Sequence, residues 1–429
     1  MTVHLIGIGG IGLSALAQLY VARGDTVTGS DRDPNPAVHE LLAQKGIEVV
    51  VGHDAANVPE GAELVVYSDA IVEGTAGFVE RAAAEERGIP TTSYFGALGE
   101  VSEHYRTIAV AGTHGKTTTT GLLGKALVDL GADPTVVVGS LVADLGGNFR
   151  LGASDLLVVE ACEYRDHLLA LAPEVLIITN LEWDHSDWFP DLAALAQTFR
   201  RAITALPEAG ALITDPHHPN IAPLLGDCAC PVLDYTQVAI GELALLGEFN
   251  RMNARAAKAA ARLVAPAADD EDLDRSLATF AGSWRRFEYK GVTAGGAPVF
   301  DDYAHHPTAI RETLLAARER FPDQALVVLF QPHLYSRTRD LFDGFAHALS
   351  IADRVLLLPI YPARERAEDF GGVSSEALAA AVADINGSAE ALARTADAPP
   401  ALAPLSPEYL LITMGAGETD RVASALTTR

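Results

Sequence analysis

Short apolar runs alternate with helix-like segments along nearly the whole chain, and this alternation restricts the fold more than any other feature. The first repeat predicts a buried strand at Val3–Ile8, a helix at Ile11–Arg23 and a second strand at Thr26–Ser30. Strands that alternate with helices form parallel sheets with helices on both faces. The sequence therefore predicts an α/β protein with parallel sheets.

The alternation falls into three blocks, and a chain of 429 residues is too long for one ordinary core. We therefore expect three domains, at residues 1–98, 99–284 and 285–429. In the third block, one helix is expected over Arg339–Ser350. The stretch Gly387–Pro407, rich in alanine and proline, is predicted to be a weakly packed connection.

Composition limits the partners of this chain. Its hydrophobic fraction of 49% allows large buried cores, and a net charge of −26 argues against nucleic acid or an anionic membrane as the main partner. Three cysteines without paired spacing form neither a disulfide framework nor a zinc site. We expect no signal peptide and no bilayer-spanning apolar stretch. We expect a cytoplasmic monomer or homodimer that binds small molecules.

A glycine-rich loop with a lysine follows the first strand of the second block, in the run VAGTHGKTTTTGLL. Glycines let backbone N–H groups approach an anion, and a helix N-terminus adds partial positive charge. The lysine would reach the β- and γ-phosphates, and the hydroxyl after it would hold Mg²⁺. Val110 stands where a full Walker A motif has its first glycine, and a plain glycine turn is the alternative. The residues expected to bind ATP here are Gly112, Thr113, His114, Gly115, Lys116, Thr117 and Thr118.

A second glycine-rich turn, GIGGIG, follows the first strand of the chain. Gly7, Gly9 and Gly12 satisfy G-x-G-x-x-G, and Asp31 lies about twenty residues further on, where an acidic residue can hold a ribose hydroxyl. The residues alone leave a dinucleotide such as NAD, another nucleotide and a merely tight turn as alternatives.

In the second block, a carboxylate and an imidazole follow predicted strands at the sheet edge that also carries the lysine loop. Glu160 ends one strand, and His185 comes shortly after the next. Together with Thr117, they could complete the coordination of Mg²⁺ at a γ-phosphate. The alternative is that Asp184 caps a helix and His185 lies on the surface.

Polar residues also follow the strands of the third block. Asp302 and His305 come after its first strand, and His333 and Arg337 come after the second. An arginine suits a bidentate grip on a carboxylate or phosphate. The adjacent histidines lack a third spaced ligand, so a zinc site is not expected. Arg286, at the boundary between the blocks, fits either an ordinary hinge or a charge that meets a nucleotide.

Taken together, these motifs resemble the Mur ligases, the ATP-dependent amide-forming enzymes of peptidoglycan precursor synthesis. Within that family they look more like the ligases that add L-alanine to UDP-N-acetylmuramate than like those that reattach a recycled tripeptide. The resemblance spans nearly the whole chain, and its last two motifs are the most specific. The motifs are GIGGIGLSALA, VYSDAI, AGTHGKTTTT, EACEYRDHLLAL, TNLEWDHSDWF, DDYAHHPT and FQPHLYSRTRDLF.

The resemblance implies three domains: a Rossmann-like one that holds the UDP substrate, a central one like the P-loop ATPases, and a Rossmann-like parallel-sheet domain that receives the amino acid. It also implies phosphorylation of the substrate carboxylate by ATP, followed by attack of the alanine amine on the acyl phosphate. The UDP-substrate residues would be Gly9, Gly10, Ile11, Gly12, Ser30, Asp31 and Ser68. ATP would also meet Asn250, Asn253, Arg286 and Asp302. Thr117, Glu160 and His185 would bind metal, and His305, His333 and Arg337 would hold the amino acid. The catalytic set would be Lys116, Glu160, His185, His333 and Arg337.

The chain departs from the family pattern at several positions. Phe249 stands where a histidine usually precedes the first asparagine, which puts the adenine contacts in doubt. Cys162 and Arg165 stand where acids are common, which weakens any role for Glu163. No lysine lies between residues 125 and 258, so the carbamylated lysine of many relatives has no counterpart. Three alternatives remain: a related ligase for a recycled peptide or another amino acid, an NAD-dependent oxidoreductase, and a non-catalytic protein switched by nucleotide.

Overall fold

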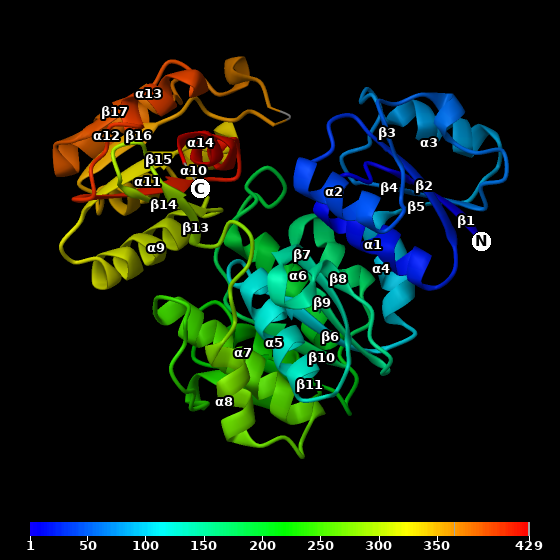
Figure 1. Cartoon of the computed structure of the whole chain (residues 1–429). Coiled ribbons are helices and arrows are strands. Elements are labelled where there is room, and N and C mark those ends of the chain that lie inside the picture. Colours follow the sequence, from blue (N-terminus) through cyan, green and yellow to red (C-terminus); the bar gives the residue numbers. More distant parts are fainter. Residues whose placement is uncertain (364, 428–429) are drawn as a thin grey trace. The chain divides into compact units, whose positions relative to one another are not determined.

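The computed structural model describes residues 1–363 and 365–427, and it contains three mainly parallel β-sheets (Figure 1). Its residues form two compact units. The first comprises residues 1–181, 195–244 and 252–281 and contains two of the sheets. The second comprises residues 182–194, 245–251 and 282–429 and contains the third.

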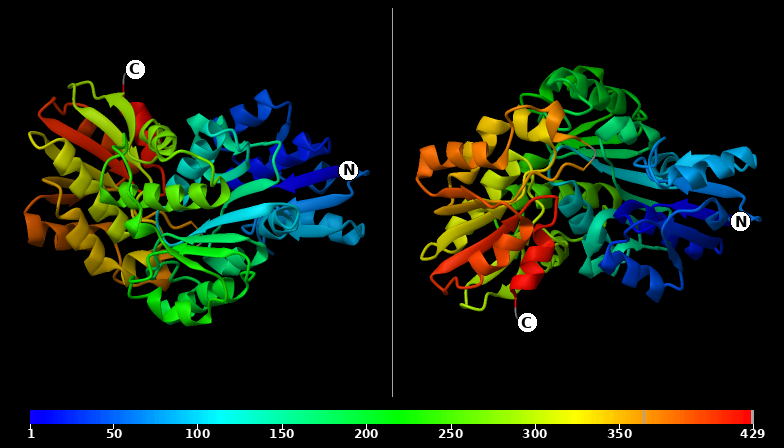
Figure 2. Two further views of the ribbon diagram at one scale, coloured as in Figure 1. Left: turned by 90° about the horizontal axis from the view of Figure 1, so that it is seen from below. Right: turned by 90° about the horizontal axis from the view of Figure 1, so that it is seen from above.

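The first sheet has five parallel strands in the order β3-β2-β1-β4-β5. Helices lie on both sides of these strands (Figure 2), as the alternating pattern predicts. The strands are β1 (Thr2–Ile6), β2 (Thr26–Asp31), β3 (Val49–Val51), β4 (Leu64–Tyr67) and β5 (Thr91–Ser93). The helices are α1 (Ile11–Ala22), α2 (Pro36–Gln44), α3 (Phe78–Glu86) and α4 (Tyr94–Ser102), with a 3₁₀ turn η1 (Ala55–Asn57).

The second sheet has seven strands in the order β12-β11-β10-β6-β9-β7-β8, and β8 runs antiparallel to β7. The strands are β6 (Arg106–Ala111), β7 (Thr135–Val142), β8 (Gly147–Arg150), β9 (Leu156–Glu160), β10 (Val175–Ile178), β11 (Ala211–Thr214) and β12 (Val232–Asp234). The helices of this region are α5 (Lys116–Asp129), α6 (Leu192–Thr204), α7 (Glu248–Val264) and α8 (Asp270–Ala278). Its 3₁₀ segments are η2 (Ala143–Leu145), η3 (Tyr164–Ala170), η4 (Ala222–Asp227) and η5 (Tyr235–Gln237).

A buried polar contact joins the first two sheets into one unit. Helix α1 packs against β7 and β8. Within this contact, Gln18 Nε2 donates to Asn148 Oδ1 at 3.0 Å, and Asn148 Nδ2 donates to Ser14 Oγ at 2.8 Å. Because these buried polar groups satisfy one another, the contact avoids the cost of unpaired polar atoms.

The third sheet has the order β13-β14-β18-β15-β16-β17, and β13 runs antiparallel to β14. The strands are β13 (Glu288–Val292), β14 (Pro298–Asp302), β15 (Ala325–Phe330), β16 (Arg354–Leu357), β17 (Ala389–Ala391) and β18 (Tyr409–Met414). The helices are α9 (Pro307–Arg320), α10 (Tyr335–Asp340), α11 (Phe342–Leu349), α12 (Ser375–Asn386), α13 (Ala398–Leu402) and α14 (Thr419–Leu426), with 3₁₀ turns η6 (Ala367–Asp369) and η7 (Thr395–Asp397).

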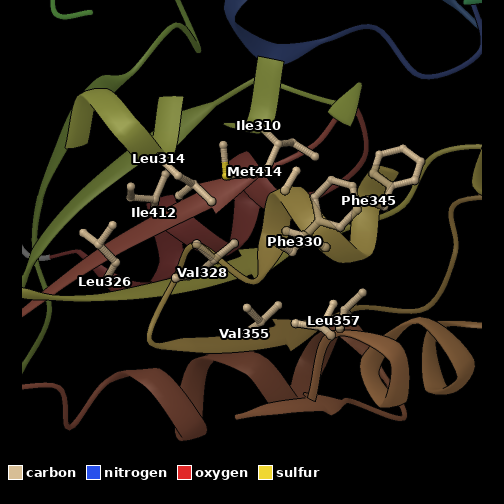
Figure 3. Close-up of a cluster of buried hydrophobic side chains, with 14 of the residues drawn as sticks. Ile310, Leu314, Leu326, Val328, Phe330, Phe345, Val355, Leu357, Ile412 and Met414 are labelled. Atoms are coloured by element: carbon tan, nitrogen blue, oxygen red, sulfur yellow. The ribbon is translucent and has the colours of Figure 1, made fainter. Parts of the chain in front are cut away.

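One face of this sheet carries the cluster drawn in Figure 3, in which α9 and α11 cover β15, β16 and β18. Phe330 and Phe345 are among its bulkiest members, with ring centroids 5.5 Å apart. The opposite face carries a second cluster that includes residues of α13 and α14. A sheet buried on both faces explains why its central strand β15 is apolar along its whole length.

Two sequence predictions are wrong in this unit. The stretch Gly387–Pro407 is not a weakly packed connection, because it supplies β17 and α13, and the side chains of Ala398 and Leu402 are fully buried. The single helix expected over Arg339–Ser350 is two helices, because the backbone at Leu341 leaves the helical conformation and its side chain packs against the core.

Candidate functional site

The lysine loop lies between β6 and α5, as the sequence predicts. Gly112 has φ +127° and Gly115 has φ +81°, conformations that favour glycine. A Cβ atom at Gly112 would also collide with the Thr179 hydroxyl, and one at Gly115 would collide with the Asn253 amide. The loop therefore requires glycine at both positions for backbone geometry and for space.

The end of β10 holds this loop in place. Asn180 Oδ1 accepts the backbone N–H of His114 at 2.9 Å, and the Thr179 hydroxyl donates to the carbonyl of His114. Tyr235, from η5, donates its hydroxyl to the carbonyl of Thr179. Thr179 and Asn180 thus fix the loop, a role that their position in the sequence does not reveal.

Lys116 forms an ion pair with Glu163, 2.9 Å from Nζ to Oε2, and the Glu163 side chain is almost fully buried. Burial disfavours the charged ammonium, but the carboxylate of Glu163 outweighs it, and the pKa of Lys116 is raised. Lys116 is therefore a fixed positive charge at the loop. The sequence pattern leaves the role of Glu163 open, and the structure shows that this carboxylate pairs with the lysine.

Cys162 is a neutral thiol at a position where the family often has an acid. Burial, reinforced by the charge of Glu163, raises the pKa of this thiol to about 12. The thiol consequently stays protonated at neutral pH and adds no charge to the Lys116–Glu163 pair.

Glu160 and Thr117 lie together beside the loop. The Thr117 hydroxyl donates to Glu160 Oε1 at 3.0 Å, and the backbone N–H of Gly139 donates to Oε2 at 2.7 Å. A Cβ atom at Gly139 would lie 2.7 Å from the carboxylate carbon and from both oxygens, so a larger residue there would push the Glu160 carboxylate aside. A hydroxyl and a carboxylate oxygen side by side are suitable ligands for Mg²⁺. No sequence motif marks Gly139, which belongs to β7.

The turn after β1 brings the N-terminal candidates together. The backbone N–H groups of Gly7 and Ile8 donate to the carbonyl of Ser30 at 2.8 and 3.1 Å, and that of Gly9 donates to Asp31 Oδ2 at 3.0 Å. Gly10 is the N-cap of α1, and Ile11 and Gly12 open that helix.

The glycines of this turn are closely surrounded. A Cβ atom on Gly9 would lie 2.6 Å from Pro34, and one on Gly12 would lie 2.8 Å from the ring of Tyr94. Ser68, after β4, lies beside Gly7, with its Cβ 3.1 Å from the position that a Cβ of Gly7 would take. The C-terminal ends of β1, β2 and β4 thus meet at this turn, the edge at which α/β sheets bind ligands.

His185 and the C-terminal candidates belong to the second compact unit. A buried charged pair of this unit joins Arg337 Nε to Asp184 Oδ1 at 2.8 Å, with both side chains at most 5% exposed. Burial raises the pKa of Asp184, but Arg337 and neighbouring histidines outweigh it and hold this pKa well below its usual range. Asp184 is therefore an ionised partner of Arg337 and does not cap a helix.

Three histidines accompany this pair. The backbone N–H of His185 donates to Asp184 Oδ1 at 2.7 Å, and His185 has φ +55°, an uncommon conformation for a residue other than glycine. His333 Nδ1 lies 3.4 Å from Arg337 Nη1. His305 Nδ1 lies 2.8 Å from the carbonyl of Tyr303, and burial together with the charge of Arg337 lowers the pKa of His305 well below its usual value. His305 is consequently neutral, with the proton on Nδ1.

Asp302 is the last residue of β14, and Arg286 precedes the neighbouring strand β13. Asp302 Oδ2 accepts the backbone N–H of Phe287 at 3.0 Å, and Oδ1 accepts that of Ala304 at 2.7 Å. Burial raises the pKa of Asp302 to about 6, although the charge of Arg286 opposes the change. Asp302 therefore titrates near neutrality.

The two asparagine candidates lie three residues apart in α7. The Asn250 amide donates to the carbonyl of Leu246 at 2.7 Å, whereas Asn253 lies against Gly115 of the lysine loop. The ring of Phe249, which replaces the expected histidine, lies beside Gly247, 2.7 Å from the position that a Cβ there would take.

Family models match three consecutive parts of the chain. The Mur ligase family catalytic domain matches residues 2–106, the Mur ligase middle domain matches residues 110–237, and the Mur ligase glutamate ligase domain matches residues 285–417. The chain belongs to the Mur ligase family. The resemblance predicted from the sequence motifs is thereby confirmed.

Relatives of this Mur ligase match it over most or all of their length. A UDP-N-acetylmuramate–L-alanine ligase of Rubrobacter xylanophilus is 36% identical over 457 residues, covering 100% of both chains. One of Agathobacter rectalis is 38% identical over 406 residues, covering 87% of this chain and 86% of the relative.

Solved structures of Mur ligases show the same fold. The UDP-N-acetylmuramate–alanine ligase MurC of Thermotoga maritima superposes with a TM-score of 0.81 at 25% identity, covering 99% of this chain and 98% of that one. This likeness confirms the predicted three-domain α/β fold. Among the residues that the structure describes, no helix of this Mur ligase is long and apolar enough to cross a membrane.

Proposed function

We propose that this Mur ligase joins L-alanine to the carboxylate of UDP-N-acetylmuramate at the expense of ATP, in peptidoglycan precursor synthesis. The observation that carries the proposal is the match, over 100% of both chains, to the UDP-N-acetylmuramate–L-alanine ligase of Rubrobacter xylanophilus. The loop geometry supports it, because a phosphate-binding loop with its paired lysine suits phosphoryl transfer better than hydride transfer. An NAD-dependent oxidoreductase would leave the Lys116–Glu163 pair and the Glu160–Thr117 pair without a role.

The first chemical step is transfer of the γ-phosphoryl group of ATP to the lactoyl carboxylate, which gives an acyl phosphate and ADP. Lys116 and the backbone N–H groups of residues 115–117 stabilise the transferring charge. Thr117 and Glu160 offer oxygen ligands for Mg²⁺, and His185 is proposed as a further ligand. When bound, Mg²⁺ neutralises phosphate charge and orients the γ-phosphoryl group.

The second step is attack of the neutral alanine amine on the acyl phosphate carbonyl, which forms the amide bond and expels phosphate. We propose that Arg337 binds the carboxylate of alanine through N–H groups other than the Nε donor that Asp184 occupies. His305 and His333 would lie around the amine, and the uncharged imidazole of His305 does not repel an incoming ammonium ion.

We propose that residues 1–98 bind the UDP part, residues 99–284 bind ATP and residues 285–429 receive the amino acid. Asn250, Asn253, Arg286 and Asp302 would contact ATP. We further propose that the enzyme acts in the cytoplasm, on small-molecule substrates, as a monomer or homodimer.

The proposal is tested by phosphate release with ATP, Mg²⁺, UDP-N-acetylmuramate and L-alanine, leaving out one component at a time. Phosphate and the amide product are expected only from the complete mixture, and an absence of ATP consumption in that mixture would refute the proposal. A panel of amino acids and peptides in the same assay tests a different acceptor, because a small pocket rejects bulky side chains sterically. A fluorescence titration with nicotinamide cofactors tests the oxidoreductase.

A further inference from the structure

A buried carboxylate in the N-terminal domain accepts hydrogen bonds from three segments of the chain. Glu80, in the first turn of α3, has no exposed surface. Its carboxylate accepts five hydrogen bonds, at 2.6 to 3.2 Å. The donors are His4 Nε2, Ser30 Oγ, His53 Nδ1, Asn57 Nδ2 and the backbone N–H of Asp54.

The carboxylate of Glu80 is ionised. Burial raises its pKa, but the bonds from His4, Ser30, Asn57 and His53 outweigh this and lower the pKa to about 2. Burying a charge is costly, and an apolar side chain of similar volume often stabilises a fold equally well. A purely structural position in a core therefore does not require an ionised carboxylate with five donors. Stabilisation of the fold alone therefore does not explain why Glu80 is an ionised carboxylate with five donors.

Ser30 connects this carboxylate to the glycine-rich turn. Its hydroxyl lies 2.6 Å from Glu80 Oε2 and 3.1 Å from His53 Nδ1. Its backbone carbonyl accepts the N–H groups of Gly7 and Ile8. Ser30 thus contacts both parts: its hydroxyl is bound by the Glu80 carboxylate, and its carbonyl binds two backbone N–H groups of the turn.

The next residue completes the connection. Asp31 Oδ2 accepts the N–H of Gly9, so two consecutive residues at the end of β2 fix three consecutive amides of the turn. The position of the turn consequently depends on where the end of β2 lies. Glu80 holds the end of β2 in place by accepting a hydrogen bond from the side chain of Ser30.

We propose that Glu80, with its partners His4, His53 and Asn57, is a positioning device for the nucleotide-binding turn and sets the affinity for the UDP substrate. This inference rests on the proposed function, because it takes the turn as the site of the UDP part. Glu80 acts through Ser30 and touches no substrate. A rigid supporting layer of this kind keeps binding groups within the narrow tolerances that recognition requires.

The test compares Glu80→Gln with Glu86→Gln, a matched control on the same helix whose side chain is exposed. Calorimetric titration measures binding of UDP-N-acetylmuramate and, separately, of ATP. Glu80→Gln is expected to weaken UDP-N-acetylmuramate binding about tenfold, the scale on which contacting residues couple. ATP affinity and kcat at saturating substrate should stay at the wild-type values, as should every property of Glu86→Gln.

A double-mutant cycle with Ser30→Ala tests whether Glu80 acts through Ser30. If it does, Glu80→Gln has little further effect on UDP-N-acetylmuramate binding in the Ser30→Ala background. If Glu80→Gln fails to fold, Asn57→Ala takes its place, since it removes one donor and leaves Ser30 in place. A smaller loss of the same affinity is then expected.

Four results would overturn the inference: unchanged UDP-N-acetylmuramate binding in a folded Glu80→Gln or Asn57→Ala protein, an equal loss of ATP affinity, a lowered kcat, or additive effects in the cycle. Failure of the proposed function is distinguishable from these results. In that case the wild-type protein itself would neither bind UDP-N-acetylmuramate nor release phosphate with it.

Discussion

Replacing Gly139 by alanine should damage the proposed metal site, although no residue proposed to bind the metal is itself replaced. The added Cβ would lie 2.7 Å from the carboxylate carbon and both oxygens of Glu160. To reach an ordinary contact of 3.4 Å, the carboxylate must move by roughly 0.7 Å. The hydrogen bond from the Gly139 N–H to Oε2, now 2.7 Å, would then lengthen beyond the normal range.

The size of the effect follows from that hydrogen bond. A bond to a charged acceptor contributes about 1.5–3 kcal/mol, and about 1.4 kcal/mol corresponds to a factor of ten in rate or affinity. Gly139→Ala is therefore expected to lower kcat/KM by roughly 10- to 100-fold, and more Mg²⁺ should be needed for half-maximal activity. Binding of UDP-N-acetylmuramate should not change, because the variant leaves the N-terminal turn intact.

The assay measures phosphate release over a range of Mg²⁺ concentrations. Gly226→Ala is the control, since its added Cβ would meet no atom within 4 Å. Thermal unfolding verifies that both variants fold. Wild-type turnover with a wild-type dependence on Mg²⁺ in the folded Gly139→Ala protein would refute the reasoning, because it would show that Glu160 need not stay where Gly139 holds it.

Three further predictions concern charged groups. Lys116→Ala should lower kcat by about 10²- to 10³-fold in a phosphate-release assay, because it removes a fixed charge that stabilises phosphoryl transfer; near-normal turnover would contradict the role of the loop. Arg337→Ala should lower the free energy of unfolding in urea by about 3–5 kcal/mol, because it leaves the buried carboxylate of Asp184 unpaired. A loss typical of an exposed ion pair, below about 1 kcal/mol, would contradict that. Asp302 has a folded-state pKa of about 6, above its ordinary value of 3.8, so the native state binds this proton more tightly than the unfolded state. The stability of the wild type relative to Asp302→Asn should therefore fall, by about 3 kcal/mol at most, as pH rises from 4 to 7. A difference that does not vary with pH in urea titrations would exclude this titration.

The sequence predicts the parts of the site that local patterns encode. The glycine–lysine spacing places the loop between β6 and α5, and the residues at strand ends place Glu160 beside Thr117. What the sequence does not predict depends on contacts between distant segments. Gly139 faces Glu160 because β7 pairs with β9, and no local pattern marks a glycine in a strand as the donor to a carboxylate 21 residues away.

Contacts between distant segments also explain the other differences between the sequence predictions and the structure. Glu163 pairs with Lys116 across 47 residues, although its neighbours in the sequence depart from the family pattern. The alanines and prolines of Gly387–Pro407 suggest a loose connection, yet Ala398 and Leu402 fill the core over the sheet. Small side chains favour a loop or a tightly packed helix equally well, and only the tertiary fold decides between them.

The ion pair between Asp184 and Arg337 has a consequence for how such enzymes exchange domains in evolution or in the laboratory. Residues 182–194 come from the middle of the chain but belong to the compact unit of the C-terminal sheet. A C-terminal segment that begins at residue 282 and is grafted onto another ligase would leave the guanidinium group of Arg337 without its own acid. Functional chimaeras should therefore take residues 182–194 and the C-terminal domain from the same parent, although the two segments are encoded far apart in the gene.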